Sequence, residues 1–173
     1  MNQDNSKDTD RLEVVTNYYN SGATYVQTPY KNGSIHGMVR YCYRNGDLKR
    51  EIPYVNGKRH GIEKCYYDSR AVQWEIPYMN GVVHGVERGY YESGVLNWET
   101  PYIAGKRHGI TKNYYASGTL CRETPYVNGN MHGIERGYDK EKTSICYIAL
   151  HDRDQELVFV ASNTYKDVNY ASE

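Results

Sequence analysis

The chain has 173 residues, with 21 basic and 21 acidic side chains and a formal charge of zero at pH 7. Without excess positive charge it has no general attraction to a phosphate backbone, so we expect no specific or generic nucleic-acid partner. Twenty tyrosines dominate the aromatic content, beside two tryptophans and one phenylalanine. Because tyrosine suits a pleated surface half exposed to water, this composition favours a thin β protein over one with a single compact apolar core.

The first ten residues are polar and acidic and predict a disordered tail without the features of a signal peptide. No segment approaches the roughly 20 apolar residues that cross a membrane as a helix. The four cysteines, Cys42, Cys65, Cys121 and Cys146, form no C-x-x-C pair. They are interpreted as free thiols in a reducing compartment, which predicts a cytoplasmic location.

A 24-residue repeat fills most of the chain. Pro-Tyr begins each copy, at Pro29, Pro53, Pro77, Pro101 and Pro125. His-Gly follows at a constant step, at His36, His60, His84, His108 and His132. Five copies without an insertion or deletion indicate a repeat architecture, which we expect to span residues 11–138, with residues 139–173 forming a C-terminal cap and tail.

Each copy carries two turn signals. The first is Asn-Gly at 32–33, 56–57, 80–81 and 128–129, with Ala104-Gly105 in the fourth copy. The second is Ser-Gly or Asn-Gly at 21–22, 45–46, 93–94 and 117–118, and Ser69-Arg70, which is weak because arginine poorly replaces glycine at positive φ. A reversal about every dozen residues leaves no room for a helix. The predicted fold class is all-β: an elongated single-sheet array of β-hairpins in a meander, with two strands per repeat.

Two-residue turns fix which residues face each other, so the register can be tested within the sequence. About the Ser-Gly turns, the repeat glutamates Glu51, Glu75, Glu99 and Glu123 face Arg40, Lys64, Arg88 and Lys112. At the ends of the array Thr16 faces Gln27, and Arg136 is predicted to face Tyr147. The same count places Trp74 opposite Cys65 and Trp98 opposite Gly89.

About the Asn-Gly turns, the same arithmetic predicts three further pairs and a histidine opposite each proline. The pairs are Arg50 with Glu63, Arg122 with Glu135, and Val26 with Val39. Opposite charges that face each other mainly specify the register.

The ends of the array depart from the repeat. Residues Leu12 to Tyr19 are predicted to form an opening half-repeat. After Tyr138, the apolar runs Ile145 to Leu150 and Leu157 to Ala161, separated by the charged stretch His151 to Glu156, predict a β-hairpin that caps the array.

The pattern Tyr-Tyr-x-x-Gly … Glu-x-Pro-Tyr-x-x-Gly-x-x-His-Gly, as in residues 90–109, resembles the bacterial variant of the MORN repeat, and it is similar to the repeat of the YwqK family of predicted antitoxins. The resemblance covers about residues 17–138. It implies an extended sheet of hairpins that holds another macromolecule, often a toxin paired with it. The Pro-Tyr of every copy departs from the commoner variant, which has a plainer residue before the tyrosine.

The repeated polar residues do not predict catalysis. Equivalent histidines two strands apart are roughly 10 Å from each other, too far to share one metal ion, and are interpreted as packing on the prolines. The repeat glutamates have basic partners at equal spacing, whereas an active site breaks symmetry. No cysteine has a unique histidine nearby. We therefore predict no catalytic, metal or cofactor site, and no enzyme.

Six residues are the candidates for binding a partner: Trp74, Trp98, Arg59, Arg107, Arg50 and Arg122. Tryptophan, tyrosine and arginine are the residues that dominate binding hot spots. Arg59 and Arg107 stand in the basic tips Lys58-Arg59-His60 and Lys106-Arg107-His108, which equally suit solvated turns. The two tryptophans suit either an exposed contact surface or the filled interior of a curved sheet.

These observations favour a protein-binding module of bacterial or phage origin, and we expect an antitoxin or inhibitor that sequesters a toxin, nuclease or other effector. A peripheral membrane or phosphoinositide-binding scaffold is the alternative, and it needs a one-sided basic and aromatic surface. A targeting module detached from an enzyme is a third possibility.

Overall fold

The computed structural model describes residues 11–141 and 144–161, the last five through their backbone alone. The predicted tail at residues 1–10 and the end of the predicted C-terminal tail, residues 162–173, lie outside this part. The described residues form β-strands joined by turns and contain no helix, so none of them supplies a helix able to cross a membrane. The predicted all-β class is confirmed.

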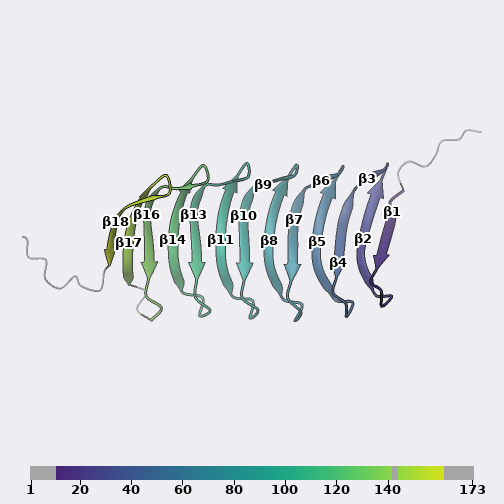
Figure 1. The fold of residues 1–173 in the computed structure, drawn as a ribbon, viewed down its shortest axis with the longest axis horizontal. Coiled ribbons are helices and arrows are strands. Elements are labelled where there is room, and N and C mark those ends of the chain that lie inside the picture. The colour runs from purple at the N-terminus through teal and green to yellow at the C-terminus, as the bar shows by residue number, and fades with distance from the viewer. Residues whose placement is uncertain (1–10, 142–143, 162–173) are drawn as a thin grey trace, which may run out of the picture. The chain divides into compact units, whose positions relative to one another are not determined.

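Eighteen strands are described (Figure 1). Their bounds are β1 Glu13–Tyr18, β2 Thr24–Lys31, β3 Ser34–Ile35, β4 Gly37–Cys42, β5 Leu48–Val55, β6 Lys58–Arg59, β7 Gly61–Tyr66, β8 Val72–Met79, β9 Val82–Val83, β10 Gly85–Tyr90, β11 Leu96–Ile103, β12 Lys106–Arg107, β13 Gly109–Tyr114, β14 Leu120–Val127, β15 Asn130–Met131, β16 Gly133–Tyr138, β17 Ile145–Asp152 and β18 Gln155–Ala161.

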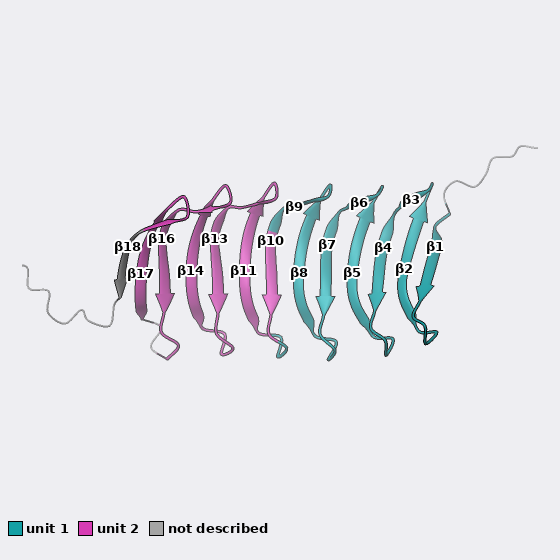
Figure 2. Ribbon diagram, viewed as in Figure 1, with its two compact units in different colours: residues 1–85, 92–94 teal, residues 86–91, 95–173 magenta. Residues whose placement is uncertain are grey.

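The chain divides into two compact units (Figure 2). Unit 1 comprises Met1–Gly85 and Glu92–Gly94, and unit 2 comprises Val86–Tyr91 and Val95–Glu173. Within each unit, consecutive strands pair antiparallel, as β4 with β5 and β13 with β14. Each unit is therefore an antiparallel meander of the predicted kind.

The His-Gly step breaks what the sequence predicts as one strand into a short and a longer piece. In the second copy, β6 ends at Arg59 and β7 begins at Gly61, whose φ is +110°. The backbone N–H of His60 donates to the carbonyl oxygen of Pro53 over 3.0 Å. A Cβ atom on Gly61 would lie 3.2 Å from Cγ of Pro53, so both the φ and the close approach require glycine here.

Both predicted turn types are present. At the first turn Asn56 and Gly57 have φ values of 49° and 76°, and Ala104 adopts the same conformation at 48°, as a type I′ turn demands. At the second turn Arg70 has a φ of 69°, where four other copies have glycine. The predicted weak turn is thus a position where an arginine occupies the left-handed region.

The register predicted about the Ser-Gly turns is confirmed along most of the chain. Glu51, Glu75 and Glu123 face Arg40, Lys64 and Lys112, Thr16 faces Gln27, and Trp74 faces Cys65. One prediction is wrong, because Arg136 faces Ile148 and Tyr147 faces Gly137. The connection before β17 is one residue longer than its counterparts. Its closing hydrogen bond joins Asp139 to Ser144, whereas the preceding one joins Tyr115 to Thr119.

The register predicted about the Asn-Gly turns is wrong by two residues beyond the His-Gly step. Tyr54 faces Arg59 as predicted, but Arg50 faces Cys65 and not Glu63. Likewise Val26 faces Tyr41, and Arg122 faces Gly137. The bulge at the His-Gly step inserts two residues, and a shift of two leaves every side chain on its predicted face. Arg50 consequently still reaches Glu63, diagonally.

The tyrosines join consecutive repeats. The hydroxyl of Tyr43 donates to the carbonyl oxygen of Tyr66 over 2.8 Å, and Tyr19, Tyr91 and Tyr115 make the same bond to a carbonyl 23 residues later. In the Tyr-Tyr pairs of the repeat, the first tyrosine binds a repeat glutamate. Tyr66, which precedes Tyr67, donates to Glu51 over 2.9 Å. The high tyrosine content therefore meets a structural need of the repeat.

The histidines also join repeats, in addition to the backbone hydrogen bond that each makes with the proline predicted to lie opposite it. The backbone N–H of Asn80 lies 3.4 Å from Nδ1 of His60, and His36 contacts Asn56 in the same way. The atom nearest to a Cβ built on Gly61 belongs to Pro53, so the glycine after the histidine packs on that ring. Among the described residues no group of three or more potential ligands could hold a metal ion.

The apolar core is small. In unit 1, Val26, Val39 and Ile52 are buried, with Ile35, Tyr41 and Tyr54 packed against them. At the end of unit 2, β17 and β18 form the predicted hairpin. The strands extend through much of the charged stretch predicted to separate them, and Arg153 and Asp154 at positive φ make the turn.

Candidate functional site

All six predicted binding residues lie on one face of their sheets. In unit 1, Arg50 pairs with Cys65 and Cys65 with Trp74, while Arg59 pairs with Tyr54, two positions from Ile52 on the same strand. Directly paired residues share a face, and alternate residues of a strand do so too. In unit 2, Trp98 and Arg122 both pair with Asn113, and Arg107 pairs with Tyr102. We call this surface of each unit the tryptophan face, and the opposite one, which carries the repeat prolines, the proline face.

A buried carboxylate organises the tryptophan face of unit 1. Glu63 is 0 % exposed and forms ion pairs with Arg50 and, at 3.4 Å between Nη1 and Oε2, with Arg59. Nε of Arg50 donates to Oε1 of Glu63 over 2.6 Å. The guanidinium groups lie over aromatic rings, Arg50 at 5.4 Å from Trp74 and Arg59 at 5.2 Å from Tyr78. Two cations offset the desolvation of one anion, so these residues stabilise each other.

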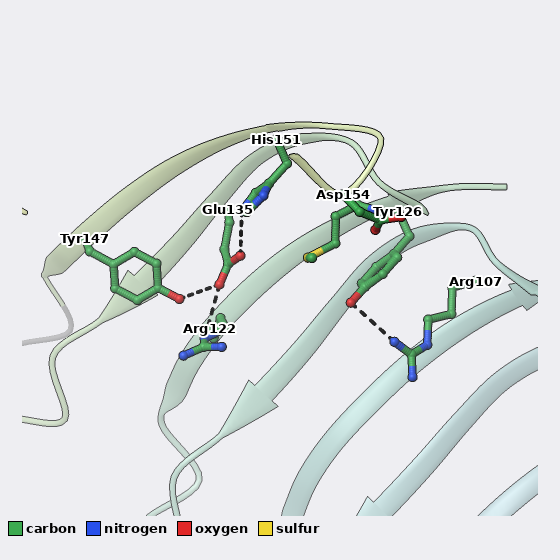
Figure 3. A network of polar contacts seen from close by, with 8 residues as sticks. Arg107, Arg122, Tyr126, Glu135, Tyr147, His151 and Asp154 are labelled. Carbon is green, nitrogen blue, oxygen red and sulfur yellow. Dashed lines mark hydrogen bonds and ion pairs between the residues drawn. The ribbon is translucent and has the colours of Figure 1, made fainter. Parts of the chain in front are cut away.

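A second buried carboxylate lies in unit 2 (Figure 3). Glu135 accepts a hydrogen bond of 2.5 Å from the hydroxyl of Tyr147, and its other oxygen lies 2.9 Å from Nε2 of His151. Arg122 approaches to 3.4 Å and lies over the ring of Tyr147 at 5.6 Å. Burial and the hydrogen bond to Glu135 raise the pKa of Tyr147 above its usual range.

Between these clusters in sequence, unit 2 has a hollow of about 390 Å³ on its tryptophan face. Three threonines, Thr100, Thr111 and Thr124, form its central row, and the hydroxyls of Thr100 and Thr111 lie 3.3 Å apart. Along one side stand Trp98, Asn113 and Arg122, and along the other Tyr102, Arg107 and Tyr126, with Glu87. We call this surface the threonine hollow.

Arg107 is held by hydroxyl groups. Its Nε lies 3.4 Å from the hydroxyl of Tyr102. Its Nη1 lies 3.3 Å from the hydroxyl of Tyr126 (Figure 3). Its guanidinium carbon is 5.2 Å from the centroid of the Tyr126 ring. Within the part of the chain that the structure describes, no carboxylate comes within ion-pair distance of Arg107. The guanidinium group of Arg107 can therefore bind an anionic ligand after a small movement of its side chain.

Glu87 is the acidic member of the hollow. Burial raises the pKa of its carboxyl, while the hydrogen bond with Tyr102 and the charge of Arg107 act in the opposite direction. The hollow thus combines the charged groups of Arg107, Arg122 and Glu87 with hydroxyl and amide groups.

The tryptophans are half-buried, between the two predicted extremes. Trp74 lies beneath Arg50, and the ring of Trp98 covers Gly89, where a Cβ atom would fall 2.3 Å from the indole. This contact agrees with the predicted pairing of Trp98 with Gly89. Each ring is anchored on the sheet and retains an accessible part beside the arginines.

Reasoning from the sequence predicted Glu63 and Glu135 only as cross-strand partners of Arg50 and Arg122, and it missed Glu87 and the threonines of the hollow. The three glutamates occupy one repeat position, the third after His, where the first copy has Val39 and the fourth has Thr111. Comparing that position across copies could have found Thr111. His151 follows the last repeat, and no periodic signal marks it.

Two other features add little to this site. A hollow of about 520 Å³ in unit 1 is lined by Tyr18, Tyr19, Tyr25 and Arg44, and the guanidinium carbon of Arg44 already lies 5.7 Å from the centroid of the Tyr19 ring. All four cysteines are free. Burial raises the pKa of the Cys65 thiol, so it is a poor nucleophile.

Comparison with protein families supports the repeat assignment. The MORN repeat variant matches residues 35–56, 83–104 and 107–128, three segments in the phase of the 24-residue period. The intervening segment in that phase contains the irregular turn at Ser69-Arg70. The search of curated proteins found no match to the chain. These matches support a repeat-based binding module.

Proposed function

We propose that this protein is a non-catalytic module that holds another protein on its tryptophan face, and that it acts in the cytoplasm as an antitoxin or inhibitor of a toxin, nuclease or similar effector. The match to a repeat used for binding supports the module. The similarity of the Tyr-Tyr-x-x-Gly and Tyr-x-x-Gly-x-x-His-Gly segments of the repeat to those of predicted antitoxins supports the finer role.

The observation that carries this proposal is that many recurring polar residues bind partners within the sheet, whereas residues that vary between copies remain for recognition. Recurring glutamates are paired, as Glu51 with Arg40 at 3.0 Å and Glu75 with Lys64 at 2.8 Å. The recurring tyrosines of the Tyr-Tyr pairs bind glutamates or backbone carbonyls. The threonine hollow contains two recurring tyrosines, Tyr102 and Tyr126, but its other residues include several at positions where the copies differ. These are Trp98, Thr100, Thr111, Asn113, Arg122 and Thr124. Recognition of a specific partner requires polar groups that are not already bonded within the repeat.

The composition of the hollow fits a protein interface. Trp98, Tyr126 and the two arginines are of the residue types that contribute most to interface affinity. The surrounding hydroxyl and amide groups supply hydrogen bonds at the rim. A volume of about 390 Å³ accommodates one or two side chains of a partner and not a whole domain, so the remaining contact area must come from neighbouring parts of the tryptophan face.

Affinity capture from the source cell, followed by co-expression, tests the proposal. Wild-type protein should recover one partner in stoichiometric amount, and co-expression should relieve the growth defect that this partner causes. Trp98→Ala should weaken capture, whereas Ile134→Ala, on the proline face, should not. A lipid overlay that is positive while no protein is recovered would reject the proposal.

A membrane-binding scaffold is the second candidate, favoured by the proline face. On the proline face of unit 2, Ile103, Ile110 and Ile134 are 52 %, 45 % and 43 % exposed, and Lys106 belongs to the neighbouring short strand. On that of unit 1, Ile62 is 50 % exposed, and Lys58 belongs to the short strand β6. Apolar groups flanked by lysine favour an anionic lipid surface. Liposome co-sedimentation at low salt tests this role, and it is excluded if no protein pellets with anionic vesicles.

A further inference from the structure

Three equivalent repeat positions carry large side chains in unit 1 and small ones in unit 2. In unit 1, Glu63 faces Ile76 across the strands, beside Ile52, and these side chains fill the centre of the tryptophan face. In unit 2, the positions 48 residues later are Thr111, Thr124 and Thr100. Each is smaller than its counterpart, and the hollow lies over them.

The missing group is specifically a carboxylate. Arg59 pairs with Glu63, four residues later, whereas Arg107 has Thr111 at that distance. Arg107 keeps the aromatic partner of its counterpart, because it lies over Tyr126 as Arg59 lies over Tyr78, both at 5.2 Å. Arg107 therefore has the same contact with a tyrosine ring as Arg59 has. Arg59 also forms an ion pair with Glu63, whereas position 111 offers Arg107 a threonine and no carboxylate.

A second cation flanks the same place. Arg122 pairs with Asn113, whose strand also carries Thr111, and it belongs to the lining of the hollow. Its contact with Glu135 is 3.4 Å long and its side chain is 51 % exposed, so it can share a further anion. The lining holds two guanidinium groups and one carboxylate, Glu87. Arg122 is shared with Glu135, so Arg107 is the main cation available to a ligand.

From this we propose that the threonine hollow is a carboxylate-binding subsite, in which an aspartate or glutamate side chain of the partner protein takes the place that Glu63 fills in unit 1. The partner's carboxylate accepts hydrogen bonds from Arg107 and from the threonine hydroxyls. Trp98, seated on Gly89, offers a flat apolar surface to the adjoining part of the partner chain.

This inference deepens the proposed function and rests on it for the identity of the ligand as a protein. The carboxylate chemistry itself can be measured without the partner. A free dicarboxylate or a phosphate would use the same arginines, so both sources must be compared directly.

The first experiment uses a Trp74→Phe background, which leaves Trp98 as the sole tryptophan. N-acetyl-glutamate N-methylamide, its neutral glutamine analogue, glutarate and inorganic phosphate are titrated in separate samples at constant ionic strength. We expect a saturable change in Trp98 fluorescence with the glutamate compound, and at least about a tenfold weaker response with the glutamine analogue. Equal responses to the two analogues would overturn the subsite. A response to phosphate or glutarate that exceeds the glutamate response would reassign its ligand to a free anion.

Two variants then localise the effect. Thr111→Glu supplies the carboxylate from the chain itself and should abolish the response while preserving or raising stability, because it rebuilds the arrangement of Arg59 and Glu63. Arg107→Met keeps the aliphatic contact with Tyr126 but removes the charge, and should weaken the response at least about tenfold. An unchanged response in either folded variant, verified by circular dichroism, would overturn the proposal.

Partner capture separates this proposal from the proposed function. Loss of capture by Thr111→Glu supports both. Undiminished capture by the same variant leaves the binding module standing and rejects the subsite. If no protein is captured by the wild type while the glutamate compound still binds to Trp74→Phe, the carboxylate chemistry stands and the assignment to a protein partner fails.

Discussion

Arg50 donates a hydrogen bond of 2.6 Å to Glu63 although the two residues do not face each other in the sheet; Arg50 faces Cys65. The contact is diagonal, reached across a bulge that shifts the register by two. Since side chains alternate between faces with a period of two, such a shift leaves every side chain on its predicted face but changes the residue directly opposite. Arg50 still reaches Glu63 because its side chain is long enough to cross the diagonal.

Removing this carboxylate should destabilise unit 1. Glu63→Ala removes a fully buried side chain and its hydrogen bond with Arg50, and it leaves Arg50 and Arg59, each 36 % exposed, without their common anion. We expect a loss of about 2 kcal/mol in the free energy of unfolding. Urea denaturation followed by the fluorescence of Trp74, with Trp98 replaced by phenylalanine, measures it. Asp47→Ala, which removes an ion pair with an arginine that is 75 % exposed, should cost at most about 1 kcal/mol. Equal losses in the two variants would show that Glu63 is not the centre of this cluster.

The tyrosine bonds between repeats should each contribute a small, measurable stability. Tyr43→Phe deletes the hydroxyl that binds the carbonyl of Tyr66 and should cost about 1 kcal/mol in unit 1. Tyr25→Phe is the matched control, since the contacts of Tyr25 are with the rings of Tyr19 and Tyr41. We expect little change there, and a Tyr43→Phe protein as stable as Tyr25→Phe would contradict this account.

The irregular turn offers a stabilising substitution. Arg70 has a φ of 69°, a conformation that costs a side chain about 1 kcal/mol or more and that glycine adopts freely. Its ion pair with Asp47 is exposed and offsets only part of this cost. Arg70→Gly should therefore raise the thermal midpoint of unit 1 in a melt, and Gly46→Arg, at the equivalent turn, should lower it. A lower midpoint for Arg70→Gly would mean that the ion pair outweighs the backbone cost.

Alkaline pH should weaken the array through its buried phenols. Burial, with the hydrogen bond to a repeat glutamate, raises the pKa of Tyr66 and of Tyr114 to about 12. Between pH 10 and pH 12 the folded state holds these protons more tightly than the unfolded state, so the stability present below pH 10 is lost as the pH rises. Absorbance titration at 295 nm should show a late class of tyrosines, reduced by one in Tyr66→Phe. Titration of all tyrosines near pH 10 would contradict the burial.

The sequence predicted the parts of the fold that depend on short-range periodicity. Asn-Gly and Ser-Gly signals place the reversals, and counting from the Ser-Gly turns pairs Glu51 with Arg40 correctly. The count fails at His60-Gly61, because a bulge depends on a φ near +110° that any glycine permits but none requires. It fails again after Asp139, where a single added residue in a connection leaves no periodic mark.

The candidate site was predictable in its residue types and not in its shape. Trp98, Arg107 and Arg122 stand out by composition, and the register places them on one face. The hollow between them depends on the absence of bulk at Thr111, and an absence becomes visible only once the neighbouring copies show what normally fills the space. Its position is therefore a property of packing and not of any motif.

Binding through the tryptophan face of unit 2 is tested most directly by placing the same charge on opposite faces of β13. Thr111 lines the hollow, and its neighbour Ile110 lies on the proline face and is 45 % exposed. Calorimetric titration of the captured partner protein against Thr111→Glu and Ile110→Glu compares the two. We predict that Thr111→Glu loses binding by at least about tenfold while Ile110→Glu binds as the wild type does. Loss of binding in Ile110→Glu with wild-type affinity in Thr111→Glu would contradict the account and place the contact on the proline face.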